Sequence, residues 1–295
     1  MQQTLPPETT MGCVGLRVSD LDRLAAFYTD VVGLTAIDRR DDVVVLGAGD
    51  RPLVTLVSDT AAPERDANAA GLFHVAFRVP SRAALGAALQ RLESHWELTG
   101  ASDHRVSEAL YARDPAGNGV EIYRDYPQAK WPDAPEGRVG IDTLPLDLDG
   151  VREAASQEQP AVDSARVPDE TDIGHIHLEV TDLDRSTEFY TDIVGLRLRQ
   201  RFGADAAFLA AGTYHHHVGI NTWNRRTAPA GDGRGLAWYE LCVPEPAMDA
   251  LEARLSEADA IVDHDATGVD VIVDCEDGEI NATDPDGIAI HFRSQ

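Results

Sequence analysis

The stretch GCVGLRVSDLDRLAAFYTDVVGL at residues 12–34 returns as GHIHLEVTDLDRSTEFYTDIVGL at residues 174–196. The two stretches are identical at 14 of 23 positions without a gap, which indicates an internal duplication. Each begins with alternating apolar residues that predict a strand, and Asp-Leu-Asp-Arg then starts a helix. The Ser or Thr before that start is the expected N-cap, and Gly33 or Gly195 is the expected C-cap. The repeat therefore predicts a strand–helix unit that occurs twice.

A second, weaker repeat relates GLFHVAFRVPSRAALGAALQRL at 71–92 to GLAWYELCVPEPAMDALEARL at 235–255. Each is followed by Asp-Pro-x-Gly, a strong turn sequence, and by a closing strand, in DPAGNGVEIY at 114–123 and DPDGIAIHF at 284–292. The sequence therefore predicts an α+β fold of four βαβββ modules. We expect these modules near residues 9–58, 70–126, 172–224 and 234–294.

The four modules are expected to form two domains, at residues 9–126 and 172–294. Residues 127–171 are rich in Pro, Asp, Glu and Gln, which favours a long connection over a packed module. This predicted linker contains one short helical candidate, near residues 149–155.

The charge of the chain limits its partners. Asp and Glu number 51 against 25 Lys and Arg, so the formal net charge is −26, and Lys130 is the only lysine. Such a surface repels phosphates and anionic lipids, so we expect neither nucleic acid nor a membrane as a partner. The acidic, lysine-poor composition resembles that of proteins from salt-accumulating halophiles. The alternative is an ordinary acidic protein from a GC-rich, arginine-using genome.

The sequence also favours a cytoplasmic protein. Cys13, Cys242 and Cys275 are widely spaced and odd in number, which fits a reducing compartment. No stretch approaches the roughly 18–20 apolar residues of a membrane helix. The N-terminus has neither the basic region nor the apolar run of a secretory signal. A homo-oligomer is expected on base rates alone.

Four segments carry a resemblance to a known family. They are GLFHVAFRVPSRAALGAAL (71–89), DHRVSEALYARDPAGNGVEIYRD (103–125), IGHIHLEVTDLDRSTEFYTDIVGL (173–196) and FLAAGTYHHHVGINTW (208–223). These segments resemble the vicinal oxygen chelate superfamily of glyoxalase I, bleomycin-resistance proteins and extradiol dioxygenases. Within it, the chain is most similar to two-domain catechol 2,3-dioxygenases of the glyoxalase-like branch. The resemblance implies two glyoxalase-like domains and a metal site.

Metal sites in this superfamily use the first and last strands of the modules. Five residues before the valine that closes each first strand, the four modules hold Cys13, His74, His175 and Trp238. At the last-strand position, the second module holds Glu121 and the fourth holds His291, whereas the first module offers no ligand. The candidate ligands therefore concentrate in the second and third modules, and the other two would make a poor site for a hard metal.

If the second and third modules pair, His74, His175 and Glu121 converge. Two imidazoles and one carboxylate form the facial triad of non-haem Fe(II) oxygenases, with positions open for substrate and O₂. Two histidines from first strands and one glutamate from a last strand also match the extradiol pattern that the resemblance implies. A lone strand histidine is more often a core residue, but two at equivalent repeat positions favour ligands. If the first module pairs with the second instead, this triad is split.

The resemblance further implies residues that act on the substrate. In the triple histidine 215–217, His216 best matches the catalytic histidine of extradiol enzymes, with His215 and His217 as alternatives. Strand alternation would place His216 on one face and its two neighbours on the other. Tyr111 matches a hydrogen-bonding tyrosine, and His104 matches a histidine just outside the metal ligands.

We therefore expect an Fe(II)-dependent extradiol dioxygenase that cleaves a catechol with O₂, although Mn(II) accepts the same ligands. One alternative is a glyoxalase-type lyase or isomerase, which needs a fourth protein ligand that His215 or His217 could supply. A second is a non-catalytic binding protein, which would not need the three ligands. A third is a structural relic whose sites have decayed.

Overall fold

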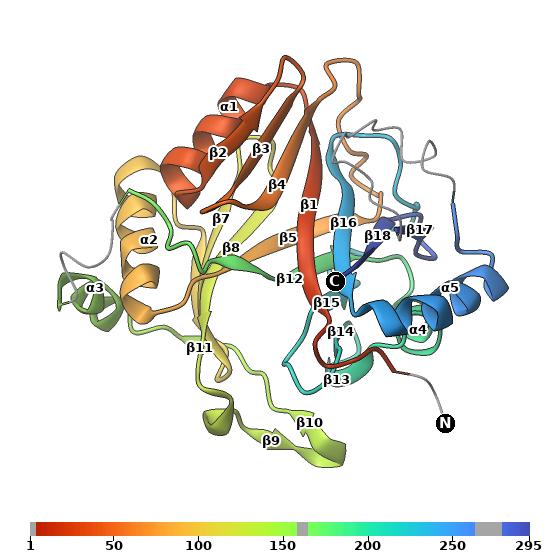
Figure 1. Ribbon diagram of the computed structural model, residues 1–295. Helices are drawn as coiled ribbons and strands as arrows, with labels where there is room; N and C mark the ends of the chain where they lie inside the picture. Colours follow the sequence, from red (N-terminus) through yellow and green to blue (C-terminus); the bar gives the residue numbers. More distant parts are fainter. Residues whose placement is uncertain (1–3, 158–164, 263–278) are drawn as a thin grey trace. The chain divides into compact units, whose positions relative to one another are not determined.

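The computed structural model describes residues 4–157, 165–262 and 279–295 (Figure 1). Its strands form two large sheets with few helices, which confirms the predicted α+β fold of repeated modules. Internal contacts divide the chain into two compact units. One comprises Met1–Ser19, Asp59–Phe73 and His175–Gln295, and the other comprises Asp20–Ser58 and His74–Gly174. Cys275 and part of the fourth predicted module lie outside the described residues.

The nine-stranded sheet contains the strands of the second and third modules, which is the pairing that the candidate ligands favoured. In spatial order its strands are β11 (Leu144–Pro145), β6 (Gly100–Asp103), β7 (Ser107–Arg113), β8 (Gly119–Asp125), β5 (Gly71–Arg78), β12 (Asp172–Glu179), β15 (Val218–Asn221), β14 (Ala206–Ala210) and β13 (Arg197–Phe202).

The seven-stranded sheet contains the strands of the first and fourth modules. In spatial order its strands are β17 (Ile280–Thr283), β18 (Ala289–Ser294), β16 (Gly235–Val243), β1 (Thr10–Val18), β4 (Arg51–Ser58), β3 (Val43–Ala48) and β2 (Thr35–Arg39). A separate two-stranded sheet joins β9 (Asp133–Ala134) to β10 (Arg138–Val139).

The helices of the two repeated stretches begin and end alike. Asp20 caps α1 (Leu21–Phe27) and Asp182 caps α4 (Leu183–Glu188), each by accepting from the backbone N–H three residues ahead. The predicted caps were one residue too early, because the first Asp of each Asp-Leu-Asp performs this role. The helices continue as π-helical turns η1 (Tyr28–Val32) and η4 (Phe189–Val194), which end at the expected glycines with φ of 93° and 91°.

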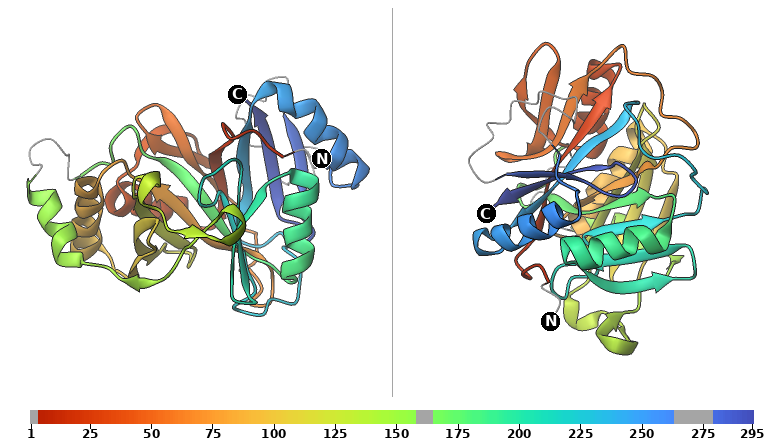
Figure 2. Two further views of the ribbon diagram at one scale, coloured as in Figure 1. Left: turned by 90° about the horizontal axis from the view of Figure 1, so that it is seen from below. Right: turned by 90° about the vertical axis from the view of Figure 1, so that its right-hand side faces the viewer.

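The predicted linker contains more structure than one helix. Its helix α3 (Leu148–Gln157) lies beside α2 (Arg82–His95) in Figures 1 and 2. The close approach depends on Gly86, where a Cβ would lie 2.4 Å from the Val151 carbonyl oxygen. The short 3₁₀ helices η2 (Gln128–Lys130) and η3 (Pro135–Gly137) also lie in this stretch, and η5 (Glu245–Ala247) leads into α5 (Met248–Glu257).

A buried tyrosine fixes the turn before each closing strand. Tyr28 donates to Asp114 Oδ2 at 3.2 Å, and Tyr190 donates to Asp284 Oδ2 at the same distance. The other oxygen of Asp114 accepts from the backbone of Ala116 and Asn118, so the turn is held at the start of β8. Burial is the largest cause of a raised pKa at both aspartates. This connection fixes the strand that carries Glu121.

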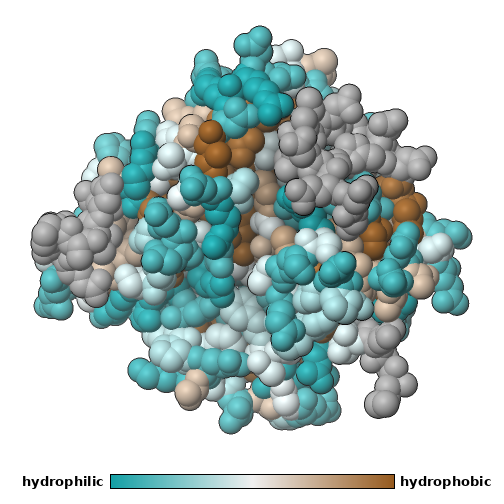
Figure 3. Space-filling view, in the orientation of Figure 1, coloured by the Kyte–Doolittle hydropathy of each residue, from teal (hydrophilic) through white to brown (hydrophobic). Residues whose placement is uncertain are grey.

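Hydrophilic side chains cover most of the described face in Figure 3, as the net charge of −26 leads one to expect. Among the described residues, no helix is long and apolar enough to cross a membrane.

Candidate metal centre

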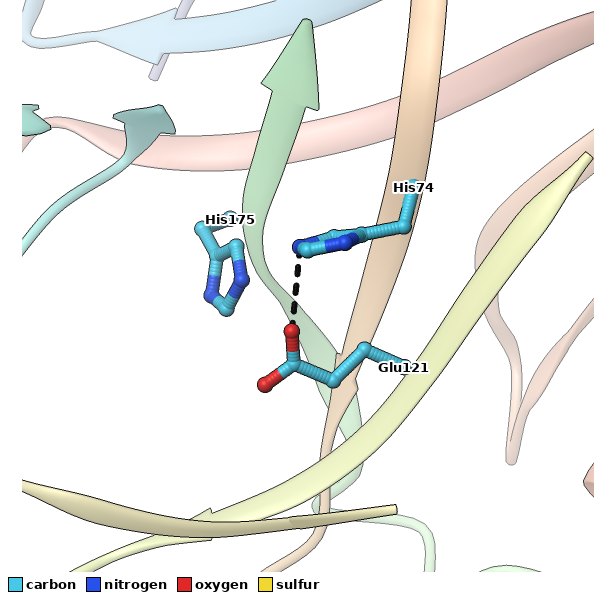
Figure 4. A group of neighbouring side chains, drawn as sticks. All are labelled: His74, Glu121 and His175. Atoms are coloured by element: carbon cyan, nitrogen blue, oxygen red, sulfur yellow. Dashed lines mark ion pairs between the residues drawn. The ribbon is translucent and has the colours of Figure 1, made fainter. Parts of the chain in front are cut away.

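Three buried side chains from β5, β8 and β12 point toward one another in Figure 4. His74, Glu121 and His175 each offer one ligand atom, and these atoms all lie within 4.8 Å of one another. His74 Nε2 lies 3.0 Å from Glu121 Oε2. The three residues are 6%, 2% and 2% exposed, respectively. The structure therefore brings together the three residues that the sequence selected, and their role as ligands stays a prediction.

The strand register explains why His74 meets Glu121. Strands β5 and β8 run parallel, with Ala76 opposite Glu121 and His74 opposite Gly119. Since residues two apart on a strand share a face, His74 and Ala76 lie on one side of β5. His74 therefore lies on the side of β5 that Ala76 shares with Glu121, and its Nε2 reaches the carboxylate.

The negative charge of Glu121 acts on its neighbour Tyr111, which lies opposite it in the β7–β8 register. Burial and, after it, the charge of Glu121 raise the pKa of Tyr111 well above its usual range. The phenol of Tyr111 therefore stays protonated at neutral pH and remains a hydrogen-bond donor.

Tyr111 belongs to a short hydrogen-bond chain. His104 Nδ1 lies 2.7 Å from the Asp142 carbonyl oxygen, and His104 Nε2 lies 2.6 Å from Tyr111 Oη. Because a carbonyl can only accept, Nδ1 donates to Asp142, and Nε2 is hydrogen-bonded to the tyrosine hydroxyl. The ring of Tyr111 also lies 5.8 Å from the ring of His74, measured between centroids. The two residues selected by resemblance are therefore joined to each other and adjacent to a candidate ligand.

The triple histidine differs from the strand that the sequence predicted. His215, His216 and His217 lie in an irregular bend before β15, so strand alternation does not apply to them. They are 0%, 7% and 7% exposed, which also excludes an exposed polar strand end. The ring of His216 lies 4.1 Å from that of His175, against 6.1 Å for His215. His217 Nδ1 instead accepts from the backbone N–H of Ala211.

Sequence reasoning missed two aromatic rings that contact His177 or His216. Phe208 contacts His216 and His177, with centroids 4.8 and 5.7 Å apart. Phe73 contacts His177 and Trp223 at 5.2 and 5.3 Å. The available signal was a difference between repeats, because the position of Phe73 holds Ala237 in the fourth module.

The family model of the Glyoxalase/Bleomycin resistance protein/Dioxygenase superfamily matches residues 10–122 and 172–292. The chain belongs to this superfamily. A catechol-2,3-dioxygenase of Bacillus subtilis (strain 168) is 38% identical over 259 residues, 85% of this chain and 89% of the relative. Glyoxalase I from Zea mays shares the fold with a TM-score of 0.55 and 17% identity, covering 97% of this chain and 92% of that one. The cppA protein from Streptococcus pneumoniae TIGR4 does so with a TM-score of 0.57 and 11% identity, over 100% of both.

In this member of the superfamily, the equivalent positions of the seven-stranded sheet hold Cys13, Trp238 and His291. Trp238 stacks on His291 with ring centroids 4.9 Å and planes 11° apart, and it is 1% exposed. Gly15 makes room for it, since a Cβ there would lie 2.3 Å from the indole. Among the described residues, only His74, Glu121 and His175 form a group that could hold a metal. A packed tryptophan takes the place of a ligand set in the seven-stranded sheet.

Proposed function

We propose that this protein is an Fe(II)-dependent extradiol dioxygenase that cleaves a catechol with O₂. The observation that carries the proposal is the buried group of two imidazoles and one carboxylate, His74, His175 and Glu121. The similarity to a catechol-2,3-dioxygenase along 85% of the chain supports the same reaction class. The two matched stretches likewise support domains at 9–126 and 172–294 joined by residues 127–171.

The donor set fits a divalent metal. With neutral imidazoles the group carries one negative charge, and a buried carboxylate is costly unless it is paired or bound to a cation. Three protein ligands of this kind are typical of non-haem iron sites that keep positions open, and Mn(II) accepts them too. When bound, the ion would orient both reactants and act as a Lewis acid. His74, His175 and Glu121 would hold it.

Tyr111 and His104 would orient the substrate. The ring of Tyr111 lies beside that of His74, and its protonated hydroxyl is hydrogen-bonded to His104 Nε2, so the hydroxyl oxygen can also accept from a substrate hydroxyl. His104 in turn is anchored to the Asp142 carbonyl oxygen. The pair therefore offers a fixed polar edge beside the ligands, which favours one orientation of the diol.

His216 is the proposed acid–base residue. Its ring lies against the ring of His175, and its Nδ1 lies 2.7 Å from His215 Nδ1. At that distance one nitrogen must donate to the other, so a proton lies between the two rings. His215 thereby holds the orientation of the His216 ring, which a residue that transfers protons requires.

The ligand count favours the dioxygenase over a glyoxalase-type lyase. A fourth ligand would have to come from the triple histidine, where His215 Nδ1 contacts His216 Nδ1 and His217 Nδ1 accepts from Ala211. None of the three joins the group of ligand atoms. A binding protein or a structural relic would need no such group, so the three alternatives from the sequence have less support.

Oxygen uptake with catechol tests this proposal. The protein is loaded anaerobically with Fe(II) in molar KCl, and consumption of O₂ is followed with the yellow ring-fission product. We expect both, and we expect Glu121→Ala to abolish them. His291→Ala, which alters the equivalent last-strand position of the other sheet, is the matched control and should behave as the wild type. Folded, iron-loaded protein that consumes no O₂ with catechol or its simple homologues would overturn the proposal.

A further inference from the structure

A cavity of about 490 Å³ lies at one end of the seven-stranded sheet, where β1 ends and where β16 and β18 begin. Residues from the stretches 63–71 and 228–234 complete its walls. Ala237 and Ala289 line the cavity and also belong to the cluster that packs around Trp238. Because ligand cavities in proteins measure about 300–1,000 Å³, a small organic molecule fits this space.

Positive charge gathers inside this cavity. The side chains of Arg17 and Arg65 are 9% and 25% exposed, and Arg234 is half-buried. The acidic residues that line the cavity are instead exposed, namely Glu64, Asp66 and Asp232. In a chain of net charge −26, three guanidinium groups are thus partly or largely withdrawn from solvent around one cavity. Such an interior favours an anion.

The three arginines differ in how their charge is balanced. Arg65 forms a salt bridge with Glu179 through Nη2. Arg17 Nε lies 3.8 Å from Asp59 Oδ2, and the Asp59 side chain is 40% exposed. Arg234 donates from Nε to a backbone carbonyl, and within the described part of the chain it forms no salt bridge. Arg17 and Arg234 therefore bring two positive charges against one distant carboxylate, and a bound anion would balance the excess.

The rest of the wall is apolar. Leu236 and Ala237 line the cavity from β16, and Ile288 and Ala289 line it where β18 begins. These side chains gain by contact with apolar atoms and cannot pair with a second charge. The cavity therefore suits a molecule with one anionic end and an apolar body.

Trp238 adds a hydrogen-bond donor beside the cavity wall. Its Nε1 is buried and has no hydrogen-bond partner among the described residues. The indole lies over Gly15, where a Cβ would lie 2.4 Å from Nε1. Gly15 and Arg17 are two residues apart on β1, so the nitrogen lies on the side of the strand that carries Arg17. Since buried indole N–H groups usually have a partner, a ligand beside Arg17 accounts for this donor.

The aligned corner of the nine-stranded sheet has no such arrangement. The repeats align Arg17 with Glu179 and Ala237 with Phe73. Glu179 is bound by two arginines, so its charge is balanced within the protein. Phe73 supplies a ring where Ala237 supplies a methyl group. The repeated fold therefore forms without an arginine-lined cavity at this corner, which points to a ligand and not to packing.

We propose that the cavity beside Trp238 binds an organic monocarboxylate with an apolar body. Arg17 and Arg234 would bind the carboxylate, because planar guanidinium groups match its two oxygens. Leu236, Ala237 and Ile288 would contact the body. A single negative charge balances the excess of the two arginines over Asp59. The site is separate from the candidate metal centre, since no candidate metal ligand lines the cavity.

Calorimetric titration with 2-naphthoate tests this site. The full-length protein, loaded anaerobically with Fe(II), should bind 2-naphthoate about tenfold more tightly than neutral 2-naphthamide, because hydrogen bonds to a charged group are stronger. Acetate, which lacks the apolar body, should bind at least about tenfold more weakly than 2-naphthoate. Arg234→Gln should remove most of the preference for the carboxylate over the amide. Arg199→Gln, at another half-buried arginine whose Nε donates to a backbone carbonyl, should keep it.

Two further readouts locate the ligand. Glu121→Ala, which lacks a candidate metal ligand, should bind 2-naphthoate as tightly as the wild type. In that background, the indole N–H signal of Trp238 is assigned in a proton–nitrogen correlation spectrum by its loss in Trp238→Phe. This signal should shift when 2-naphthoate binds.

Several results would overturn the site. They are no measurable binding of 2-naphthoate, equal affinities for the carboxylate and the amide, or an unchanged preference in Arg234→Gln. Binding that is lost in Glu121→Ala would place the carboxylate at the metal centre instead, and an unshifted Trp238 signal would place it elsewhere. Tighter binding of 2-naphthyl phosphate than of 2-naphthoate would replace the carboxylate with a phosphate. None of these outcomes depends on O₂ uptake, so the dioxygenase proposal is tested separately.

Discussion

The strands β12 and β1 come from one sequence repeat and present different side chains. The site face of β12 carries His175, His177 and Glu179. The aligned positions of β1 hold Cys13, Gly15 and Arg17. The same elements follow both strands along the chain, first a capped helix and then a π-helical turn. The same strand–helix backbone therefore forms with either set of three side chains.

The partner strands differ in the same way. His74 of β5 aligns with Trp238 of β16, and Glu121 of β8 aligns with His291 of β18. In the nine-stranded sheet these positions form a polar group of three, whereas in the seven-stranded sheet the indole of Trp238 stacks on His291. The comparison teaches that this fold forms with that interior packed, so the buried polar group in the other sheet is not needed for the fold and is a candidate for chemistry.

Truncating the aligned residues His74 and Trp238 should affect different properties, activity in the first case and stability in the second. His74→Ala should lower O₂ uptake with catechol by about 10³-fold, because loss of metal removes several kcal/mol of stabilisation of the transition state. Trp238→Ala should leave iron content intact and lower the free energy of unfolding by about 3–5 kcal/mol. Oxygen uptake and urea unfolding measure the two effects. Loss of iron in Trp238→Ala with retention in His74→Ala would reverse the assignment of the two sheets.

The two turn aspartates should differ in their response to pH. Burial raises the pKa of Asp284 to about 7, and Ile288 stands where the Asn118 amide donates to Asp114. The folded protein then holds the proton of Asp284 more tightly than the unfolded chain. The free energy of unfolding should therefore fall as pH rises from about 4 to about 7, by up to about 4 kcal/mol.

Asp284→Asn should flatten this dependence, and Asp114→Asn should flatten it less. Urea unfolding at a series of pH values, at constant salt, measures the slopes. Equal slopes in the wild type and Asp284→Asn would show that Asp284 is ionised in the folded protein at this pH.

Removing the Tyr111 hydroxyl should slow the reaction without releasing the metal. Tyr111→Phe is expected to lower kcat about 10–100-fold, because the group is adjacent to the ligands and is not one of them. His104→Ala should act similarly, and the double variant should be little worse than either, since the two form one hydrogen-bonded unit. Tyr126→Phe, which breaks a contact with Asp103, is the control and should keep kcat. Strictly additive losses would separate Tyr111 from His104.

Substitution of the glycines that face Trp238 and His177 should show how much space each sheet leaves for an added methyl group. Gly15→Ala would place a Cβ 2.3 Å from the indole, and such overpacking should lower the free energy of unfolding by about 1–3 kcal/mol. Gly219→Ala approaches the His177 ring at 3.0 Å, so we expect a smaller loss of stability. Thermal unfolding distinguishes the two variants. A larger loss of stability in Gly219→Ala than in Gly15→Ala would contradict the comparison.

The modules and the candidate ligands could be predicted because both repeat. Identity at 14 of 23 positions fixed the strand–helix units, and His74 and His175 stood out because they share a position five residues before a valine. Glu121 followed from alternation in a regular strand. The sheet order then followed the pairing that these three residues favoured. The roles of His216, Tyr111 and His104 stay predictions.

Features that depend on tertiary packing could not be predicted in the same way. Ser19 and Thr181 were expected as N-caps, but side-chain geometry selects the aspartate that follows each of them. The triple histidine looks like a strand end, yet it folds as a buried bend whose rings contact one another. The Trp238 stack depends on a glycine in a different module. That stack is a contact between distant residues, and local periodicity carries no record of it.

The central claim is that the same fold holds a metal in one sheet and not in the other. The most direct test is the iron content of His175→Ala and of Cys13→Ala, which truncate aligned residues of the repeat, after identical anaerobic loading and desalting. We predict one Fe(II) per chain in the wild type and in Cys13→Ala, and none in His175→Ala. Iron retained by His175→Ala, or lost from Cys13→Ala, would contradict the claim.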